Sequence, residues 1–379
     1  MKLVRTAKIK LNIKAEEILP TLEAYTKAFN FVCEIGFEKK ESSKFALHKF
    51  VYYDIRKKFL LPSQLTISVI GKAVDALKST FTKTKHKKYG SCPRSKLCAI
   101  RLDIRSYNLF LIKSEISFST ISGRKRFKLD ISDYHKEYFK SWKHCSADLC
   151  IKKNKVYLHI SFEKDIEDII SDGKMLGIDR GINNLVVSSD NKFYSGKQTK
   201  HICQKYKTLR SQLQKKGTKS AKRHLKRLSG KERRFKADIN HQISKQIINS
   251  LNPGDIIVLE NLKGIRNKRL RKPQRTMINS WNFYQLEQFL TYKAEAKGIK
   301  IQYVDPRYTS QRCSKCGFKC RSNRKSQSGF CCKSCGFKLN ADLNGSRNIV
   351  LKASGTYTDS DEAVINQPIV SIERLDTNI

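Results

Sequence analysis

Hydrophobic and polar residues alternate with different periods in successive parts of the first half of the chain. Residues 7–13, AKIKLNI, are apolar at every second position, which predicts a strand with one buried face. Apolar residues recur with a helical period from about 15 to 80, and strand-like alternation returns at 100–130. The clearest hairpin is at 146–164, where two alternating runs flank a turn. We therefore expect residues 1 to about 170 to form a strand-rich body with a helical insert.

The second half of the chain, which begins near Lys174, has a different order of elements. The pattern predicts a buried strand, a tight hairpin and another strand (175–195), a basic helical region (198–250), a short apolar strand (255–262), a helix (281–297), a strand (299–305) and a final helix (341–352). The uninterrupted apolar run at 255–262 is typical of a central strand that is covered on both faces. The last 25 residues carry five acidic side chains and one basic one, which indicates a loose tail.

The net charge of the chain indicates that its binding partner is a polyanion. The 379 residues include 77 Lys and Arg against 34 Asp and Glu, a formal charge of +43. A compact protein tolerates this self-repulsion when a polyanion neutralises it. Because the sequence has no apolar run of transmembrane length and no lipidation signal, we favour nucleic acid over an anionic membrane.

The basic charge is densest at 197–236, where sixteen Lys or Arg residues accompany a single acid, Glu232. A long basic surface of this kind suits the backbone of a nucleic acid duplex. A solvated basic helix remains the alternative, because the helix already has a core face, which is formed by Ile202, Tyr206, Leu209 and Leu213.

Eight of the 12 cysteines have no regular spacing, which argues against a secreted disulfide framework. They are Cys33, Cys92, Cys98, Cys145, Cys150, Cys203, Cys320 and Cys331. The N-terminal residues alternate in polarity and do not resemble a signal peptide. Unpaired thiols indicate a reducing compartment, and we expect the protein in the cytoplasm, associated with the nucleoid.

The other four cysteines form two C-x-x-C pairs, each followed by Gly and separated by fifteen residues. They are Cys313, Cys316, Cys332 and Cys335. Tetrahedral zinc takes four thiolates at about 2.3 Å, and this spacing is typical of such sites. The alternative is two dithiols without metal. Cys331 competes with Cys332, but Cys332 keeps the C-x-x-C spacing to Cys335, and Cys320 is a spare thiol. A site with four cysteine ligands is closed, so the expected zinc is structural.

Three carboxylates stand at the ends of predicted core elements. Asp179 follows the strand in LGIDRG, Glu260 follows the strand in IVLENL, and Asp342 opens the final helix. Carboxylates suit Mg²⁺ or Mn²⁺, and two such ions would support phosphodiester hydrolysis. Taken singly, Asp179 could be a turn residue, Glu260 the partner of a lysine, and Asp342 a helix N-cap. The order strand-Asp, strand-Glu, helix-Asp is typical of RNase H-like (RuvC-type) nucleases.

Several of these segments together resemble the TnpB family, also called OrfB, of insertion-sequence transposons, which is related to the compact type V CRISPR effectors. The segments are GIDRGINNLVVSSDN, IVLENLKG, WNFYQLEQFLTYKAEAKGIKIQYVDPRYTSQRCSKCG and GFCCKSCGFKLNADLNGSRNI. The resemblance covers roughly 175–350, and residues 52–79 also resemble the N-terminal region of the family. Arg180 departs from it, because many relatives have an apolar residue there, so the local shape after Asp179 is open to test.

The resemblance implies a mixed α/β and β fold in which a RuvC nuclease domain with an inserted zinc ribbon follows a β-barrel-like wedge domain with a helical recognition insert. The implied boundaries are 1–14 and 97–172 for the wedge, 15–96 for the insert, 173–308 and 338–354 for the nuclease domain, 309–337 for the ribbon and 355–379 for a flexible acidic tail.

The resemblance also implies an RNA-guided DNA endonuclease of a transposable element. One chain would hold a guide RNA from the transposon end, read a short flanking motif and cut double-stranded target DNA. Asp179, Glu260 and Asp342 would hold two catalytic Mg²⁺ or Mn²⁺ ions, and the cysteines one structural zinc. The alternatives are an RNA-guided repressor that does not cut, a transposase accessory protein, and a plain zinc-ribbon nucleic-acid binder. The last leaves Asp179 and Glu260 unexplained.

Overall fold

The computed structural model describes residues 2–82, 90–166, 171–263 and 282–357. The chain divides into two compact units, Met1–Glu167 and Asp168–Ile379. Within the described ranges no helix has the length and apolar character needed to cross a membrane. The predicted acidic tail lies almost wholly outside these ranges.

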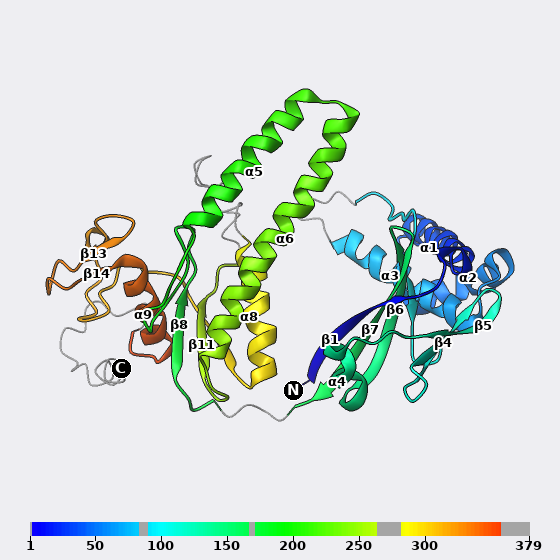
Figure 1. Ribbon diagram of the computed structural model, residues 1–379, viewed down its shortest axis with the longest axis horizontal. Helices are drawn as coiled ribbons and strands as arrows, with labels where there is room; N and C mark the ends of the chain where they lie inside the picture. Colours follow the sequence, from blue (N-terminus) through cyan, green and yellow to red (C-terminus); the bar gives the residue numbers. More distant parts are fainter. Residues whose placement is uncertain (1, 83–89, 167–170, 264–281, 358–379) are drawn as a thin grey trace. The chain divides into compact units, whose positions relative to one another are not determined.

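The first unit contains two antiparallel sheets (Figure 1). The larger has the order β1 (Lys2–Leu11), β7 (Lys155–Asp165), β6 (Lys143–Lys152) and β2 (Ile100–Leu102). The smaller joins β3 (Tyr107–Phe110), β4 (Glu115–Thr120) and β5 (Gly123–Lys128). The predicted hairpin is confirmed, since β6 and β7 meet at Lys153 and Asn154, both with positive φ. Such a pair of left-handed residues is what a two-residue hairpin turn requires.

Helices occupy the chain between β1 and β2, as predicted. They are the short 3-10 turn η1 (Ala15–Glu17), α1 (Leu19–Glu38), α2 (Lys44–Phe59) and α3 (Ser63–Thr82), while α4 (Asp133–Ser141) precedes β6. Helices and sheets share one hydrophobic core, which includes Tyr25, Leu65 and Ile160.

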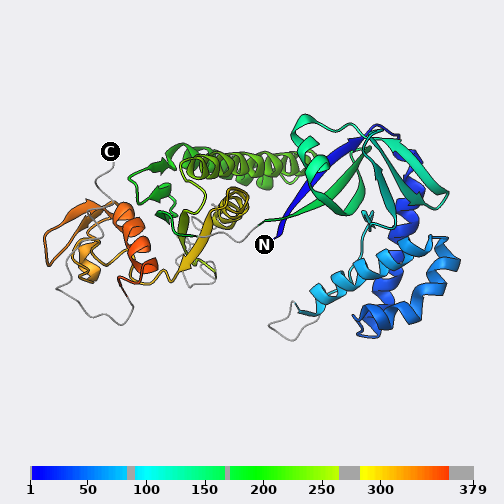
Figure 2. The same ribbon diagram turned by 90° about the horizontal axis from the view of Figure 1, so that it is seen from below.

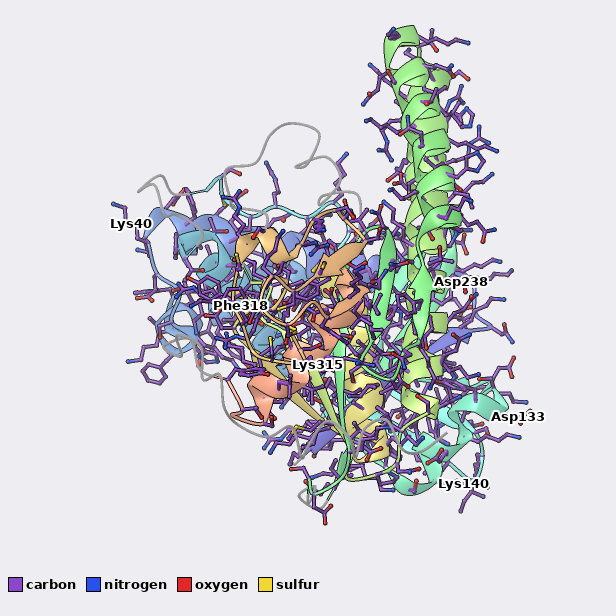
Figure 3. All side chains as sticks on the ribbon, turned by 90° about the vertical axis from the view of Figure 1, so that its left-hand side faces the viewer. Lys40, Asp133, Lys140, Asp238, Lys315 and Phe318 are labelled. Carbon is purple, nitrogen blue, oxygen red and sulfur yellow. The ribbon has the colours of Figure 1, made fainter. Side chains whose placement is uncertain are left out.

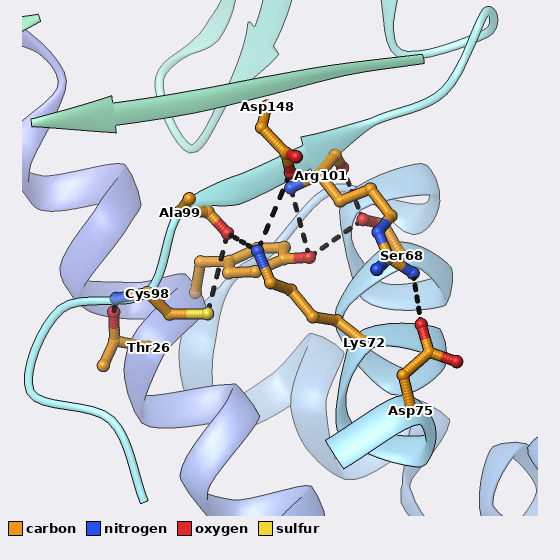
Figure 4. Close-up of polar contacts among 9 residues, drawn as sticks. Thr26, Ser68, Lys72, Asp75, Cys98, Ala99, Arg101 and Asp148 are labelled. Atoms are coloured by element: carbon orange, nitrogen blue, oxygen red, sulfur yellow. Dashed lines mark hydrogen bonds and ion pairs between the residues drawn. The ribbon is translucent and has the colours of Figure 1, made fainter. Parts of the chain in front are cut away.

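Polar contacts fix the helices to the sheet (Figure 4). The Cys98 amide donates to Thr26 of α1 at 2.8 Å, and the Lys72 ammonium of α3 donates to the Ala99 carbonyl at 2.5 Å. Arg101 of β2 pairs with Asp75 of α3 at 2.8 Å. These contacts satisfy polar groups at the point where the helical segment returns to the sheet, and they tie both α1 and α3 to β2 and the residues before it.

The second unit is built on a five-stranded sheet. Its order is β10 (Phe193–Ser195), β9 (Asn184–Ser188), β8 (Met175–Asp179), β11 (Ile256–Glu260) and β12 (Lys300–Val304). Strands β8, β11 and β12 are parallel, whereas β9 and β10 form an antiparallel extension. The carboxyl ends of the three parallel strands therefore meet at one edge.

Helices cover both faces of this sheet (Figures 1 and 2). On one face, α9 (Ala341–Ala353) packs Ile349 against Val258 of β11. On the other face, α6 (Lys219–Asn249) and α8 (Phe283–Lys297) pack over Leu259. The prediction that β11 is a central, doubly covered strand is confirmed.

The basic helical region consists of two antiparallel helices, α5 (Lys197–Lys216) and α6, which extend beyond the sheet (Figure 1). Gly217, at φ +65°, ends α5, and the Thr218 side chain caps α6. The predicted core face is confirmed in part, because Tyr206, Leu209 and Leu213 belong to the apolar cluster between the helices.

One of the two acids of this hairpin, Glu232, is largely buried between cations. Glu232 contacts Arg210 across the hairpin and accepts from Lys236 at 2.7 Å. Most of the other cations remain on the surface, and Figure 3 shows side chains ending in nitrogen along both helices. The hairpin therefore uses one internal ion cluster to join its helices and leaves most of its positive charge outward.

Candidate functional site

The three predicted carboxylates lie at one edge of the second unit's sheet. Asp179 is the last residue of β8 and Glu260 the last of the neighbouring parallel strand β11. Asp342 is the second residue of α9, which packs on the same two strands. Gly345 brings the helix close to the sheet, since a Cβ there would lie 3.1 Å from Asp179 Oδ2. The fold thus brings together three acids that are far apart in sequence.

Neighbouring polar groups orient two of these carboxylates. Asp342 accepts from the Asn184 amide of β9 at 3.0 Å and from the Arg324 guanidinium at 3.2 Å. Glu260 Oε1 accepts from the Thr309 hydroxyl at 2.6 Å. Hydrogen bonds of this kind fix side-chain rotamers, so these neighbours hold two of the three carboxylates in place.

Asp342 is not the N-cap of α9, which was one of the alternative interpretations. The cap is Asn340, whose side-chain oxygen accepts from the backbone amides of Asp342 and Leu343 at 2.9 and 3.2 Å. Because Asn340 satisfies these amides, the Asp342 carboxylate remains available to face the site.

Burial and mutual repulsion oppose ionisation at this edge. Burial raises the pKa of Asp179 to about 8, with added contributions from the charges of Glu260 and Asp342. Burial also raises the pKa of Glu260, although the Thr309 hydrogen bond and the charge of Arg180 act in the opposite direction. Carboxylates gathered in a poorly solvated place favour a cation, which would replace the proton. The donor set is therefore suited to Mg²⁺ or Mn²⁺.

The structure shows how Arg180 is accommodated after Asp179, where many relatives have an apolar residue. Its guanidinium is buried, and it donates to the Glu260 carbonyl at 2.5 Å and to Glu287 of α8 at 2.6 Å. Asp179 lies against α9, whereas Arg180 points to α8 on the opposite face, as successive strand residues do. The arginine thus ties the end of β8 to β11 and α8 without disturbing Asp179.

The four predicted cysteines form the second cluster. Their sulfur atoms all lie within 4.8 Å of one another, with Cys313–Cys335 at 3.8 Å and Cys316–Cys332 at 3.5 Å. Four thiolates around tetrahedral zinc are about 3.8 Å apart, so the geometry fits that ion. Cys331 lies outside the cluster, as predicted, in β13 (Gly329–Cys331).

Local turns build this cluster. The Gly317 amide bonds the Cys313 carbonyl, and the Gly336 amide bonds the Cys332 carbonyl, at 2.9 and 3.1 Å. Both glycines have positive φ, +78° and +70°, which favours Gly over residues with a Cβ. Burial raises the pKa of the Cys316 thiol to about 11, so a cation is needed to hold the thiolate at neutral pH.

The cysteine segment is fastened to α9. Asn344 accepts from the Ser314 amide at 2.9 Å and donates to the Arg312 carbonyl at 2.8 Å, and Asn348 donates to the Thr309 carbonyl at 2.8 Å. The segment also contains the 3-10 turn η3 (Arg321–Asn323), which Arg324 follows, and β14 (Lys338–Asn340) leads directly into α9. The ribbon and the third carboxylate therefore form one connected structure.

The sequence did not identify Asn184, Arg324 or Asn340 as parts of the site. Asn184 begins β9, the strand that pairs with β8 after the turn that follows Asp179, and its polar side chain at the start of an apolar strand was a usable signal. Arg324 lies among other basic residues of the ribbon and had no distinguishing signal, because its contact depends on how the ribbon folds back.

Two family models match parts of the second unit, and one of them also includes the last residues of the first unit. The "Probable transposase" model OrfB_IS605 matches residues 159–264, and the "Cas12f1-like, TNB domain" model matches residues 283–349. Together these ranges include all three carboxylates and all four clustered cysteines.

Curated relatives agree with the models. The CRISPR-associated endodeoxyribonuclease Cas12f1 of Sulfoacidibacillus thermotolerans is 31% identical over 219 residues, which are 53% of this chain and 51% of that protein. A TnpB-like protein of Methanocaldococcus jannaschii is 29% identical over 215 residues, 52% of this chain and 75% of that protein. The match thus spans about half the length of the Cas12f1 relative.

A solved structure shows the same fold. The protein in a cryo-EM structure titled as a Cas12f1–sgRNA–target DNA complex aligns with a TM-score of 0.57 at 15% identity, over 87% of this chain and 81% of that one. At this identity the likeness concerns the fold. The two family models and the curated relatives, in contrast, identify the chain as a member of the TnpB (OrfB) family with a TNB domain, related to the Cas12f type V effectors.

Proposed function

We propose that the chain is an RNA-guided DNA endonuclease of a transposable element, which cuts target DNA after guide pairing and recognition of a short flanking motif. The observation that carries the proposal is the convergence of Asp179, Glu260 and Asp342 at the carboxyl edge of β8 and β11. Burial, together with the charges of Glu260 and Asp342, raises the pKa of Asp179. Support also comes from the Cas12f1 relative, whose name describes an endodeoxyribonuclease.

In this proposal the three carboxylates would hold divalent cations, Mg²⁺ or Mn²⁺. Such ions, when bound, supply an activated water and stabilise the leaving oxygen in phosphodiester hydrolysis. The chain's own residues hold the ligands: Asn184 and Arg324 orient Asp342, and Thr309 orients Glu260. Gly345 leaves room for Asp179 beside α9. The Arg324 guanidinium also places a positive charge beside the site, where it can attract a phosphate.

The cysteine cluster has a structural role in the proposal. Cys313, Cys316, Cys332 and Cys335 would hold one zinc, with no position left for water or substrate. Because Asn344 and Asn348 fasten this segment to α9, the bound zinc would stabilise the helix that presents Asp342.

The basic hairpin of α5 and α6 is our candidate for backbone contacts with the guide–target duplex. Base pairing reads the sequence in RNA-guided systems, while the protein holds the duplex by its backbone. The outward lysines and arginines of the hairpin supply the charge for that contact without demanding base readout.

The test is co-expression of the full chain with its flanking genomic DNA, followed by sequencing of the RNA that co-purifies. That RNA is then used to direct cutting of matching DNA in Mg²⁺, beside the Asp179→Ala variant. Cutting that needs both the RNA and Asp179 supports the proposal. Specific DNA binding without cutting would contradict it in favour of an RNA-guided repressor, and absence of RNA would contradict guided recognition altogether.

A further inference from the structure

A pocket of about 580 Å³ opens in the second unit on the α8 face of its sheet. This volume lies in the range of roughly 300–1,000 Å³ that is usual for pockets that bind small ligand groups. Its walls come from the end of β11, from α8 and from β12. The lining residues are Asn261, Lys263, Tyr284, Glu287, Gln288, Thr291, Tyr292 and Tyr303.

Helix α8 has two adjacent faces, one buried in the core and one lining the pocket. Phe283, Leu286 and Leu290 are buried in the core beneath it. The adjacent stripe places Tyr284, Gln288 and Tyr292 in the pocket at four-residue intervals, which is one face of a helix. Aromatic and amide side chains thus occupy a face that would otherwise carry solvated charges.

The pocket is nearly neutral despite its glutamate. Glu287 is paired with the buried Arg180 at 2.6 Å, and it accepts from the Tyr303 hydroxyl at 3.2 Å. Lys263 adds a positive charge to the lining. The carboxylate of Glu287 would repel an anion in this pocket. A flat polar ring would instead contact the tyrosine rings and the neutral amides.

The position of the pocket connects it with the carboxylates. Asn261, in the pocket wall, directly follows Glu260, and Arg180, which supports the pocket, directly follows Asp179. The carboxylates lie on the α9 face and the pocket on the α8 face, but both are at the carboxyl edge of β8 and β11. A DNA strand that crosses this edge of the sheet would pass from the face of the carboxylates to the face of the pocket.

The geometry points to a nucleobase subsite: we propose that this pocket takes an unstacked base of the single-stranded DNA segment that approaches the three carboxylates. The inference rests on the proposed nuclease function. Tyr284, two-thirds exposed at 66%, and Tyr303, at 46%, offer ring faces on which a base stacks. Gln288 and Asn261 can each donate and accept hydrogen bonds, and the Thr291 hydroxyl, which donates to the Glu287 carbonyl, can accept one, so the pocket accommodates different bases.

The test is photo-crosslinking of the full chain, purified with its RNA, to a thymidine oligonucleotide that carries one 5-iododeoxyuridine. EDTA prevents cutting, and about 0.3 M NaCl suppresses non-specific phosphate contacts. Crosslinked peptides are identified by mass spectrometry, and affinity is measured by fluorescence anisotropy. A second arm uses the corresponding RNA with 5-iodouridine, which distinguishes a DNA strand from the guide RNA as the source of the base.

We expect crosslinks at Tyr284 or Tyr303 with the DNA probe. Tyr284→Ala should weaken binding of the oligonucleotide about tenfold, as expected for loss of one stacked base. Tyr284→Phe, which keeps the ring, should bind within about twofold of wild type. Phe193→Ala removes an exposed ring at β10, on the other edge of the same sheet, and should leave binding unchanged.

Crosslinks that map only outside the pocket, or normal affinity in Tyr284→Ala, would overturn the subsite. Crosslinks with the RNA probe alone would overturn its assignment to DNA. The two proposals fail separately, because binding is measured without metal. Guided cutting without crosslinks in the pocket would reject only the subsite, whereas crosslinks in a chain that never cuts would reject only the nuclease.

Discussion

Two clusters in the second unit, one of thiols and one of carboxylates, are built in opposite ways. Each cysteine pair is shaped by its own turn and a left-handed glycine, Gly317 or Gly336. The carboxylates come from β8, β11 and α9 and meet only because the sheet and helix pack together.

The spacing of the ligand atoms follows from this difference. In the part of the chain that the structure describes, the four cysteines are the one group of three or more potential metal ligands whose atoms all lie within 4.8 Å of one another. The carboxylates are oriented by Thr309, Asn184 and Arg324 and are set farther apart. A compact thiol cluster fits a permanently held ion, and a more open carboxylate set fits ions that enter with water or substrate.

The largest effect should come from loss of a carboxylate. Asp179→Asn should lower guided cutting by about 10³-fold or more, close to 4 kcal/mol of transition-state stabilisation, because the ligand charge is lost. Cutting rates under single-turnover conditions provide the measurement. Asp190→Asn is the matched control, since Asp190 is a half-buried aspartate in the turn between β9 and β10, away from the carboxylates. Equal activity of the two variants would contradict the carboxylate site.

Loss of a clustered cysteine should act on metal content and on the fold of the ribbon. Cys332→Ser should reduce bound zinc from one per chain to nearly none and expose the ribbon to protease, because structural zinc supplies folding free energy. Metal analysis and limited proteolysis measure the two effects. Its neighbour Cys331→Ser should keep the zinc, since Cys331 lies outside the cluster. Loss of zinc in both variants would show that the cluster is assigned wrongly.

Removal of Arg180 should lower the local stability of the sheet edge at which β8 and β11 end. Arg180→Met should lower local stability by about 3 kcal/mol, because Glu287 would keep a largely buried charge without its partner. Hydrogen exchange of the β8 and α8 amides measures this loss. The double variant Arg180→Met/Glu287→Met should recover much of the stability, since both charges are then absent. An additive loss would argue that the pair does not act as a unit.

The smallest effect is expected at the start of α9, where the cysteine segment joins the helix that carries Asp342. Asn340→Ala removes the cap of α9 and should cost about 1 kcal/mol. Thr218→Ala, which removes the cap of α6, should cost a similar amount. If the cap also positions Asp342, guided cutting should fall more in Asn340→Ala than in Thr218→Ala. Equal cutting would leave Asn340 with a purely structural role.

Periodicity and local spacing predicted the elements well because those features depend on nearby residues. The apolar run of β11, the turn at Asn154 and the choice of Cys332 over Cys331 are all confirmed. In each case the deciding contact lies within a strand, a turn or a knuckle.

Contacts made by tertiary packing were not predictable in the same way. The hydrogen bond from Arg324 to Asp342 depends on how the ribbon folds back on α9. The burial of Arg180 depends on Glu287, more than one hundred residues later in the chain. The sequence showed Arg180 as a departure from the family pattern, and only the fold explains how its charge is accommodated.

The most direct test of the central claim is to deplete and restore metals while both cutting and zinc content are followed. The full chain with its RNA is dialysed against EDTA, then supplied with Mg²⁺, Mn²⁺ or Zn²⁺ separately. We predict that EDTA stops cutting while zinc stays at one per chain, and that Mg²⁺ or Mn²⁺ restores cutting without changing the zinc content. Cutting that persists in EDTA, or that returns only with Zn²⁺, would contradict the account of two separate sites.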